Sequence, residues 1–160
     1  ISCSLVGSEM CIRDSFKSDD IQGHQRYSGF ISELFRSGLI IPDENVFWYT
    51  TETKENLFDD PEEVLKRLGD NTAVVCYNDE VAFGLVKCLL SAGRRVPEDV
   101  AVVSFDNSNL SWISQVPITS LSYEDRNIGR IAAQKLVDIL DGRDVSSEVL
   151  PWTFIQKESS

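Results

Sequence analysis

The chain has one histidine, one methionine and four cysteines among its 160 residues. No C-x-x-C pair joins Cys3, Cys11, Cys76 and Cys88, which argues against the common zinc and dithiol motifs. The lone His24 has no evident serine or cysteine nucleophile as a partner, so a catalytic triad or a histidine metal site is not predicted. The scattered glycines form neither G-x-G-x-x-G nor a P-loop. We therefore expect no enzymatic activity, no cofactor and no metal.

Basic residues are also scarce, with 15 Lys and Arg against 26 Asp and Glu and a net charge of −11. Such a surface repels phosphate backbones, so this stretch is not expected to bind DNA by itself. No apolar run approaches the roughly 20 residues of a membrane helix. Cys76 and Cys88 fall in predicted buried elements, where free thiols act as small hydrophobes. This cysteine usage favours a reducing, cytoplasmic location.

Residues 1–15 show no regular apolar period. The run Leu5–Ser15 resembles a translated sequencing-library adapter over eleven consecutive residues. A signal peptide would need a basic start and a longer apolar stretch. We therefore predict that 1–15 is a non-native tail outside the fold, with native sequence beginning near Phe16.

Two apolar strands, 72–77 and 100–105, are separated by a helix predicted over about 79–92. Continuous apolar strands joined by a helix indicate an α/β fold with a doubly wound parallel sheet covered on both faces. Ser122 and Asp125 resemble a capping box before another helix that ends at Gly142. A strand end is predicted at 16–18, followed by a helix that has Phe35 on its apolar stripe and ends at Gly38. The remaining predicted elements are a helix capped by Asp60 that ends at Gly69, strands at 46–51 and 119–121, and an edge strand interrupted by Pro151.

Both apolar strands end on polar pairs, Asn78-Asp79 and Asp106-Asn107. Ligands of parallel sheets bind beyond the carboxyl ends of the strands. Asn78 can donate and accept, as a sugar hydroxyl does, and Asp106 can accept from two hydroxyls. The alternatives are a helix cap for Asn78 and a turn for Asp106, while Asp79 is expected to serve only the helix dipole. Arg26 offers a planar fork of donors, or is simply a solvated helix arginine.

Other polar and aromatic residues have ordinary explanations. Asp19 and Asp20 could bind a metal as a pair, but capping of the following helix is the stronger interpretation. Trp48 and Trp112 could stack on a sugar face, although packing in the core or a loop is the more common role.

Four stretches resemble the effector-binding domain of the LacI/GalR repressor family: 26–30, 73–82, 96–107, and 119–122 with the helix that contains Gly129. The resemblance covers nearly all of 16–160. Residues 16–23 and 48–52 are more similar still to arabinose-responsive repressors, which combine this sensor with a GntR-type winged helix-turn-helix.

This resemblance implies a type I periplasmic-binding-protein-like fold with a sugar between two lobes, of which the chain holds the C-terminal part. Residues 16–117 would form the C-terminal lobe, 118–141 a strand and helix that cross to the missing N-terminal lobe, and 142–160 a return segment. The DNA-binding domain would precede residue 16, so operator DNA would be bound only through it. A homodimer in the cytoplasm is also implied.

Matched residue by residue, Arg26, Asn78 and Asp106 correspond to effector contacts of the family. Asn107 replaces a frequent second Asp, a change expected to matter little, and Lys157 replaces a frequent Arg. Three further candidates for effector binding are Asp20, Thr50 and Tyr123, the last standing where many relatives have Gln.

The leading hypothesis is a sugar-sensing module of a transcriptional repressor, with L-arabinose as the favoured effector. A sugar-binding protein of a transport system with the same fold is the main alternative, and a small α/β hydrolase or sugar-modifying enzyme is a third. The upstream gene distinguishes the first two, because a winged helix indicates repression and a secretory signal indicates transport.

Overall fold

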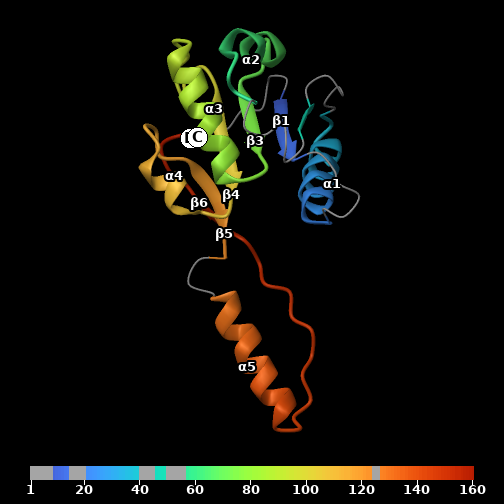
Figure 1. Cartoon of the computed structure of the whole chain (residues 1–160). Helices are drawn as coiled ribbons and strands as arrows, with labels where there is room; N and C mark the ends of the chain where they lie inside the picture. The colour runs from blue at the N-terminus through green and yellow to red at the C-terminus, as the bar shows by residue number, and fades with distance from the viewer. Residues whose placement is uncertain (1–8, 15–20, 40–45, 50–56, 124–126) are drawn as a thin grey trace.

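A single sheet forms the centre of the protein (Figure 1), described in a computed structural model for residues 9–14, 21–39, 46–49, 57–123 and 127–160. The described strands have the order β2-β1-β3-β4-β5-β6, parallel except for the antiparallel pair β5 and β6. The strands are β1 Glu9–Asp14, β2 Val46–Tyr49, β3 Ala73–Cys76, β4 Ala101–Phe105, β5 Thr119–Ser122 and β6 Thr153–Ile155; the helices are α1 Ile21–Arg36, α2 Pro61–Leu68, α3 Asp79–Ser91, α4 Asn109–Ile113 and α5 Ile128–Leu140.

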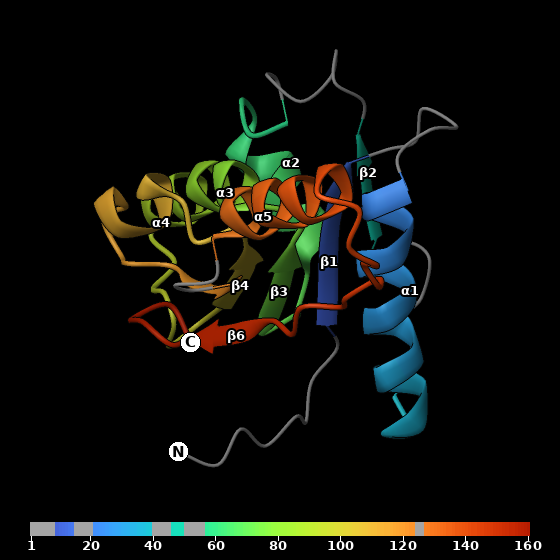
Figure 2. The ribbon, with the colours of Figure 1, turned by 90° about the horizontal axis from the view of Figure 1, so that it is seen from below.

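The main hydrophobic core lies between α3 and one face of the sheet. Val74 and Cys76 of β3 and Val102 of β4 are buried on this face, whereas Val75 and Val103 point the other way and are only half-buried. This alternation follows from the two-residue period of a strand. The predicted parallel α/β sheet is confirmed, but among the described side chains of β3 and β4 those on the α3 face are buried and those on the other face are half-buried. α1 lies beside β1 and covers the other face in part (Figure 2).

The helix predicted after Asp60 is confirmed as α2. The Asp60 carboxylate accepts from the backbone N–H groups of Glu62 and Glu63 at 3.1 and 3.2 Å, and Pro61 occupies the first turn. Gly69 ends the helix with φ +55°, in the left-handed region that glycine tolerates best. No helix that the structure describes is long and apolar enough to cross a membrane.

The strand β1 corrects the expectation that residues 1–15 lie outside the fold. Glu9–Asp14 lies between β2 and β3 and is paired in parallel with both, Cys11 with Val46 and with Val75. A central strand needs free N–H and C=O groups on both edges, which any non-proline residue provides. The lack of an apolar period in 9–14 therefore did not prevent pairing. The predicted strand at 16–18 lies outside the described residues, and the non-native origin of the tail stays a prediction.

The helix α5 starts later than the sequence indicates. Asn127 is its N-cap and accepts from the backbone N–H of Arg130 at 2.9 Å. The capping box expected at Ser122 is wrong, since Ser122 ends β5, and Asp125 lies outside the described residues. β5 also pairs with β4, so the strand assigned to another lobe belongs to this sheet, and the boundary expected at residue 118 moves to the end of β5.

Apolar side chains on two helices remain uncovered. α5 stands apart from the sheet and has no buried residue, with Leu136 57% and Leu140 77% exposed (Figure 1). In α1, Phe35 was expected on the buried stripe but is 73% exposed, while Leu34 is buried. Adjacent residues on a helix point in directions about 100° apart, so Leu34 faces the protein and Phe35 does not.

A buried carboxylate connects the elements at the carboxyl edge of the sheet. Asp79, 1% exposed at the start of α3, accepts from the hydroxyls of Ser104 in β4 and Ser120 in β5, the latter at 2.8 Å. Its second oxygen accepts from the backbone N–H of Ser108, the N-cap of α4. Asp79 therefore does more than serve the helix dipole, because it joins α3, β4, β5 and α4.

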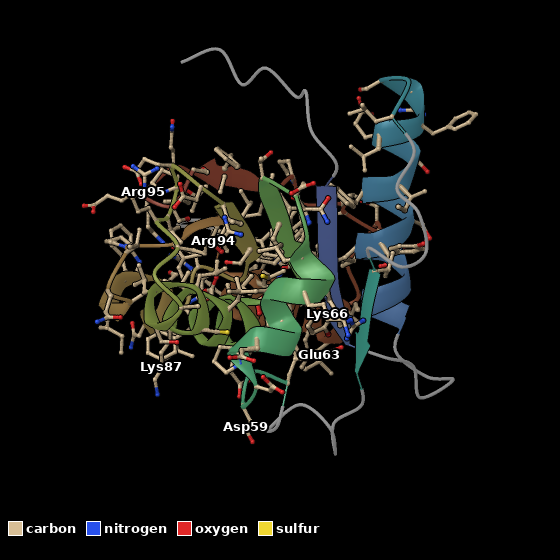
Figure 3. The ribbon with its side chains drawn as sticks, turned by 90° about the horizontal axis from the view of Figure 1, so that it is seen from above. Asp59, Glu63, Lys66, Lys87, Arg94 and Arg95 are labelled. Carbon is tan, nitrogen blue, oxygen red and sulfur yellow. The ribbon has the colours of Figure 1, made fainter. Side chains whose placement is uncertain are left out.

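We predict that Asp79→Asn lowers the free energy of unfolding by about 2–3 kcal/mol, because the amide nitrogen cannot accept and one buried donor loses its partner. Urea denaturation measures this change. Asp59→Asn is the matched control, since Asp59 lies at the outer surface (Figure 3) and should change stability by less than about 0.5 kcal/mol. Equal effects of the two substitutions would contradict the role of Asp79.

Candidate functional site

A pocket of about 460 Å³ opens at the carboxyl edge of the sheet. This volume falls within the range of small-molecule sites. The pocket brings together side chains from α1, the end of β3, the end of β4 and the two chain segments that connect the sheet to α5. Its lining residues are Arg26, Tyr77, Asn78, Asp106, Ser122, Tyr123, Ile128 and Trp152.

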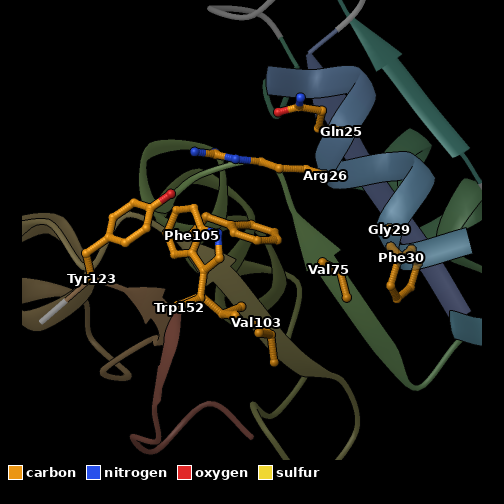
Figure 4. Close-up of a pocket in the computed structure, with 10 residues that line it drawn as sticks. Gln25, Arg26, Gly29, Phe30, Val75, Val103, Phe105, Tyr123 and Trp152 are labelled. Carbon is orange, nitrogen blue, oxygen red and sulfur yellow. The ribbon is translucent and has the colours of Figure 1, made fainter. Parts of the chain in front are cut away.

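Arg26 reaches from α1 across the strand ends. Its Nη1 donates to the backbone oxygen of Tyr77 at 2.6 Å, and its Nη2 forms an ion pair with Oδ1 of Asp106 at 3.0 Å. The guanidinium carbon lies 4.8 Å from the ring centroid of Tyr77. It lies 4.8 Å from the ring centroid of Phe105 and 5.7 Å from that of Trp152 (Figure 4). The Arg26 side chain is 13% exposed, so this is not a solvated helix arginine.

The turn after β4 fixes Asp106 at the rim. Asp106 and Asn107 have φ angles of +97° and +49°, in the left-handed region that Asp and Asn tolerate better than most residues. The backbone N–H of Asp106 donates to the Leu121 oxygen at 2.9 Å, and that of Asn107 donates to the Ser120 hydroxyl at 3.0 Å. The Asp106 side chain stays 43% exposed, so its carboxylate has room for a ligand as well as for Arg26.

Asn78 has the helix-capping role that the sequence left open. Its Oδ1 accepts from the backbone N–H of Val81 at 3.1 Å, and the residue also lines the pocket. With the oxygen engaged by the cap, the amide nitrogen is the group left to donate to a ligand. Capping and ligand binding are thus compatible at this position.

A second cluster lies behind the rim and centres on Lys157. Its Nζ donates to Oδ1 of Asn107 at 2.7 Å, to the Ser111 hydroxyl at 2.8 Å and to the Ile118 oxygen at 2.9 Å, and it lies 4.1 Å from the ring centroid of Trp112. Burial lowers the pKa of Lys157, partly opposed by the charge of Asp79. Trp112 therefore contacts Lys157 rather than the pocket.

The structure brings Arg26, Asn78, Asp106 and Tyr123 to one pocket. The candidates Asp20 and Thr50 lie outside the described residues, and so does the side chain of Trp48. In the part of the chain that the structure describes, no three His, Cys, Asp or Glu residues are grouped as a metal site would require.

Sequence reasoning missed Trp152. The pairing of β5 with β6 carries it to the rim, where its ring stacks on Tyr123 with centroids 4.1 Å apart and meets Phe105 edge-on at 5.6 Å. The signal was available, because an antiparallel edge strand beside β5 must bring the residue before it to the end of β5.

An adjoining pocket of about 440 Å³ runs along the half-buried face of the sheet (Figure 4). Phe30 of α1 and Val75 and Val103 of the sheet form its apolar part, and Arg26 and Trp152 line both pockets. The Arg26 guanidinium with its aromatic neighbours thus separates a polar rim from an apolar interior.

The family description that matches residues 9–160 is "Periplasmic binding protein-like domain". The chain belongs to this family. The match begins with β1 and includes every described strand and helix. The expected periplasmic-binding-protein-like fold is therefore confirmed.

Among its relatives, an arabinose metabolism transcriptional repressor of Halalkalibacterium halodurans is 34% identical over 131 residues, covering 79% of this chain and 34% of the repressor. One of Geobacillus stearothermophilus is 32% identical over 133 residues, covering 81% and 36%. The solved transcriptional regulator CelR–cellobiose complex superposes with a TM-score of 0.79 at 28% identity, covering 95% of this chain and 46% of that chain. The chain thus spans about a third of the length of these curated relatives.

We predict that Asn107→Asp stabilises the domain at pH 7 by about 1 kcal/mol, because a carboxylate replaces a neutral acceptor of the Lys157 ammonium. In the parent chain the pKa of Lys157 is lower in the folded state than its ordinary value of 10.5, so at alkaline pH the unfolded state binds more protons than the folded state. The free energy of unfolding therefore rises as the pH rises toward 10.5. The added carboxylate would raise the pKa of Lys157, and the advantage of the variant should shrink over the same interval.

Urea denaturation of both proteins between pH 7 and 10.5 checks this pH dependence. Asn109→Asp, two positions further along the chain and exposed on α4, is the control for adding a carboxylate. A variant that is no more stable than the parent at any pH would show that Lys157 does not need a charged partner.

Proposed function

We propose that this domain binds a neutral sugar, with L-arabinose the favoured effector, and is the effector-binding part of a transcriptional repressor. The observation that supports this most directly is the convergence of Arg26, Asn78 and Asp106 on one pocket. The relatives named as arabinose metabolism repressors support the choice of sugar.

The charges of the site favour a neutral solute over an anionic one. Arg26 and Asp106 form an ion pair, so the guanidinium has little free positive charge for a phosphate or carboxylate. The half-exposed carboxylate of Asp106 can accept from neighbouring hydroxyls, and the amide nitrogen of Asn78 can donate to a hydroxyl oxygen. A polyhydroxylated ligand satisfies both groups at once.

Aromatic side chains provide the apolar part of the same pocket. The rings of Tyr123 and Trp152 line it beside Arg26. Binding sites for small ligands combine apolar walls with a few placed polar groups, which is the composition found here. A sugar presents C–H groups on one face and hydroxyls at its edge, and this arrangement matches both.

The greater length of the relatives supports a role within a longer protein. We assign operator binding to a GntR-type head that precedes this domain in the full-length protein, which would act in the cytoplasm and without catalysis. The exposed apolar residues of α5 then pack against the N-terminal lobe. A sugar-binding protein of a transport system remains the alternative, and a secretory signal in place of the winged helix upstream would favour it.

We predict that L-arabinose binds the full-length protein with measurable heat, and that Asp106→Asn weakens binding at least about tenfold, because a charge-assisted bond is replaced by a neutral one. Asn tolerates the left-handed backbone at this position, so the fold should be kept. Isothermal titration with L-arabinose, D-xylose and D-ribose measures the affinities.

The control for this titration is Asp59→Asn, which changes the same chemical group at the outer surface and should bind as the parent does (Figure 3). Absence of heat with every pentose would overturn the sugar assignment. Heat accompanied by conversion of the sugar would favour the hydrolase hypothesis over the sensor.

We further propose that α4 lies in a homodimer interface. Trp112 and Ile113 are 55% and 69% exposed on this short helix. A groove of about 170 Å³ lies between α3 and the end of α4, lined by Phe83, Val86, Lys87, Ser114 and Gln115. Exposed apolar residues next to a groove of this composition suit the same surface of a second copy, as two-fold symmetry requires.

We predict that Ile113→Asp shifts the protein from dimer to monomer, because two carboxylates would face each other across a two-fold interface. Light scattering coupled to size-exclusion chromatography measures the mass. Phe35→Asp, an equally exposed apolar residue on α1, should leave the dimer intact. A dimer that survives Ile113→Asp but not Phe35→Asp would place the interface on α1 instead.

A further inference from the structure

The stacked pair of Tyr123 and Trp152 occupies a special place in the topology. In the antiparallel pairing of β5 and β6, Ser122 lies opposite Thr153. The next two residues outward are Tyr123, where the chain leaves the sheet toward α5, and Trp152, where it returns. Their rings are 4.1 Å apart with an interplanar angle of 30°. The stack thus joins the two connecting segments at the point where backbone pairing stops.

Beyond this point, α5 and the segment that follows it hold to each other. Lys135 of α5 donates to the Ser146 oxygen at 2.9 Å and forms an ion pair with Glu148 at 3.4 Å. Arg143 pairs with Asp138 at 2.6 Å. No residue of α5 is buried in this chain, so α5 and residues 143–148 form a unit that the two connecting segments join to the sheet.

The same two rings are walls of the candidate site. Tyr123 and Trp152 line both adjoining pockets, and Trp152 also contacts Phe105 edge-on and lies 5.7 Å from the Arg26 guanidinium (Figure 4). Trp152 is 36% exposed, so part of its ring is available to a ligand. A molecule in the pocket therefore touches the groups that hold the connecting segments together.

We propose that the Tyr123–Trp152 stack couples occupancy of the pocket to the orientation of α5. Trp152 provides a flat apolar surface for the C–H face of the sugar, and a sugar that packs there favours one geometry of the stack and hence one orientation of α5. The choice of ligand in this inference rests on the proposed function, whereas the stack is present in the chain without any ligand. A ligand shifts a conformational equilibrium only by contacting two states differently, and these rings provide such a contact.

The orientation of α5 can be measured by the distance between spin labels on Glu62→Cys in α2 and Ala133→Cys in α5, both exposed positions. Cys3 and Cys11 are replaced by alanine, while Cys76 and Cys88 are buried, and burial raises the pKa of the Cys88 thiol and slows its labelling. An excess of unlabelled chain keeps one labelled copy in each dimer.

Without sugar, Trp152→Leu should broaden the distance distribution about twofold, whereas Trp152→Phe, which keeps a ring, should stay close to the parent. Phe35→Leu, an exposed aromatic substitution on α1, is the control and should change nothing. An unchanged width in Trp152→Leu, or equal broadening in Trp152→Phe, would overturn the role of the stack.

With L-arabinose, the parent distribution should shift, and Trp152→Leu should lose the shift and about tenfold in affinity. A tenfold loss of affinity with the shift retained would make Trp152 a ligand contact only and would overturn the coupling. If no pentose binds the parent, the proposed function fails together with the coupling, while the measurement without sugar still decides whether the stack orients α5.

Discussion

The buried Asp79 carboxylate is the constraint on which the carboxyl edge of the sheet depends. It begins α3 and accepts hydrogen bonds from β4, β5 and the N-cap of α4, so four elements meet at one side chain. A buried charge is costly unless all its oxygens have donors, and here both do. The network positions the turn after β4, which contains Asp106. The geometry of the candidate site therefore depends on Asp79, although Asp79 does not line the pocket.

Most polar groups of the pocket are satisfied within the protein before any ligand binds. Arg26 is held by the Tyr77 oxygen, by Asp106 and by aromatic rings, and Asn78 is held by the cap of α3. The entropy cost of ordering these side chains thus arises on folding rather than on binding, which favours high affinity for a small solute. In the proposed function, the carboxylate of Asp106 and the amide nitrogen of Asn78 are the groups that would bind the hydroxyls of an uncharged ligand.

Much of this arrangement follows from local sequence. The β3-α3-β4 unit, the Asp60 cap and the polar residues at both strand ends could be predicted, because each is encoded within a few neighbouring positions. The failures have a common origin in long-range pairing. β1 is a strand because β2 and β3 flank it, Asp79 is buried because Ser104 and Ser120 reach it, and Trp152 reaches the rim through β6. Local sequence patterns cannot predict contacts that depend on elements far away in the sequence.

The hydrogen bonds at the rim also bear on how a bound ligand could change the orientation of α5. The described hydrogen bonds of Asp79 and Asn78 join residues on the sheet side and include no residue of α5. On the other side, α5 and residues 143–148 hold to each other through their own ion pairs. Between these two units, the described contacts that touch both the pocket and the connecting segments are the rings of Tyr123 and Trp152. Among the residues that the structure describes, the routes by which the proposed sugar would influence α5 are therefore this stack and a direct contact with Ile128, the pocket residue on α5.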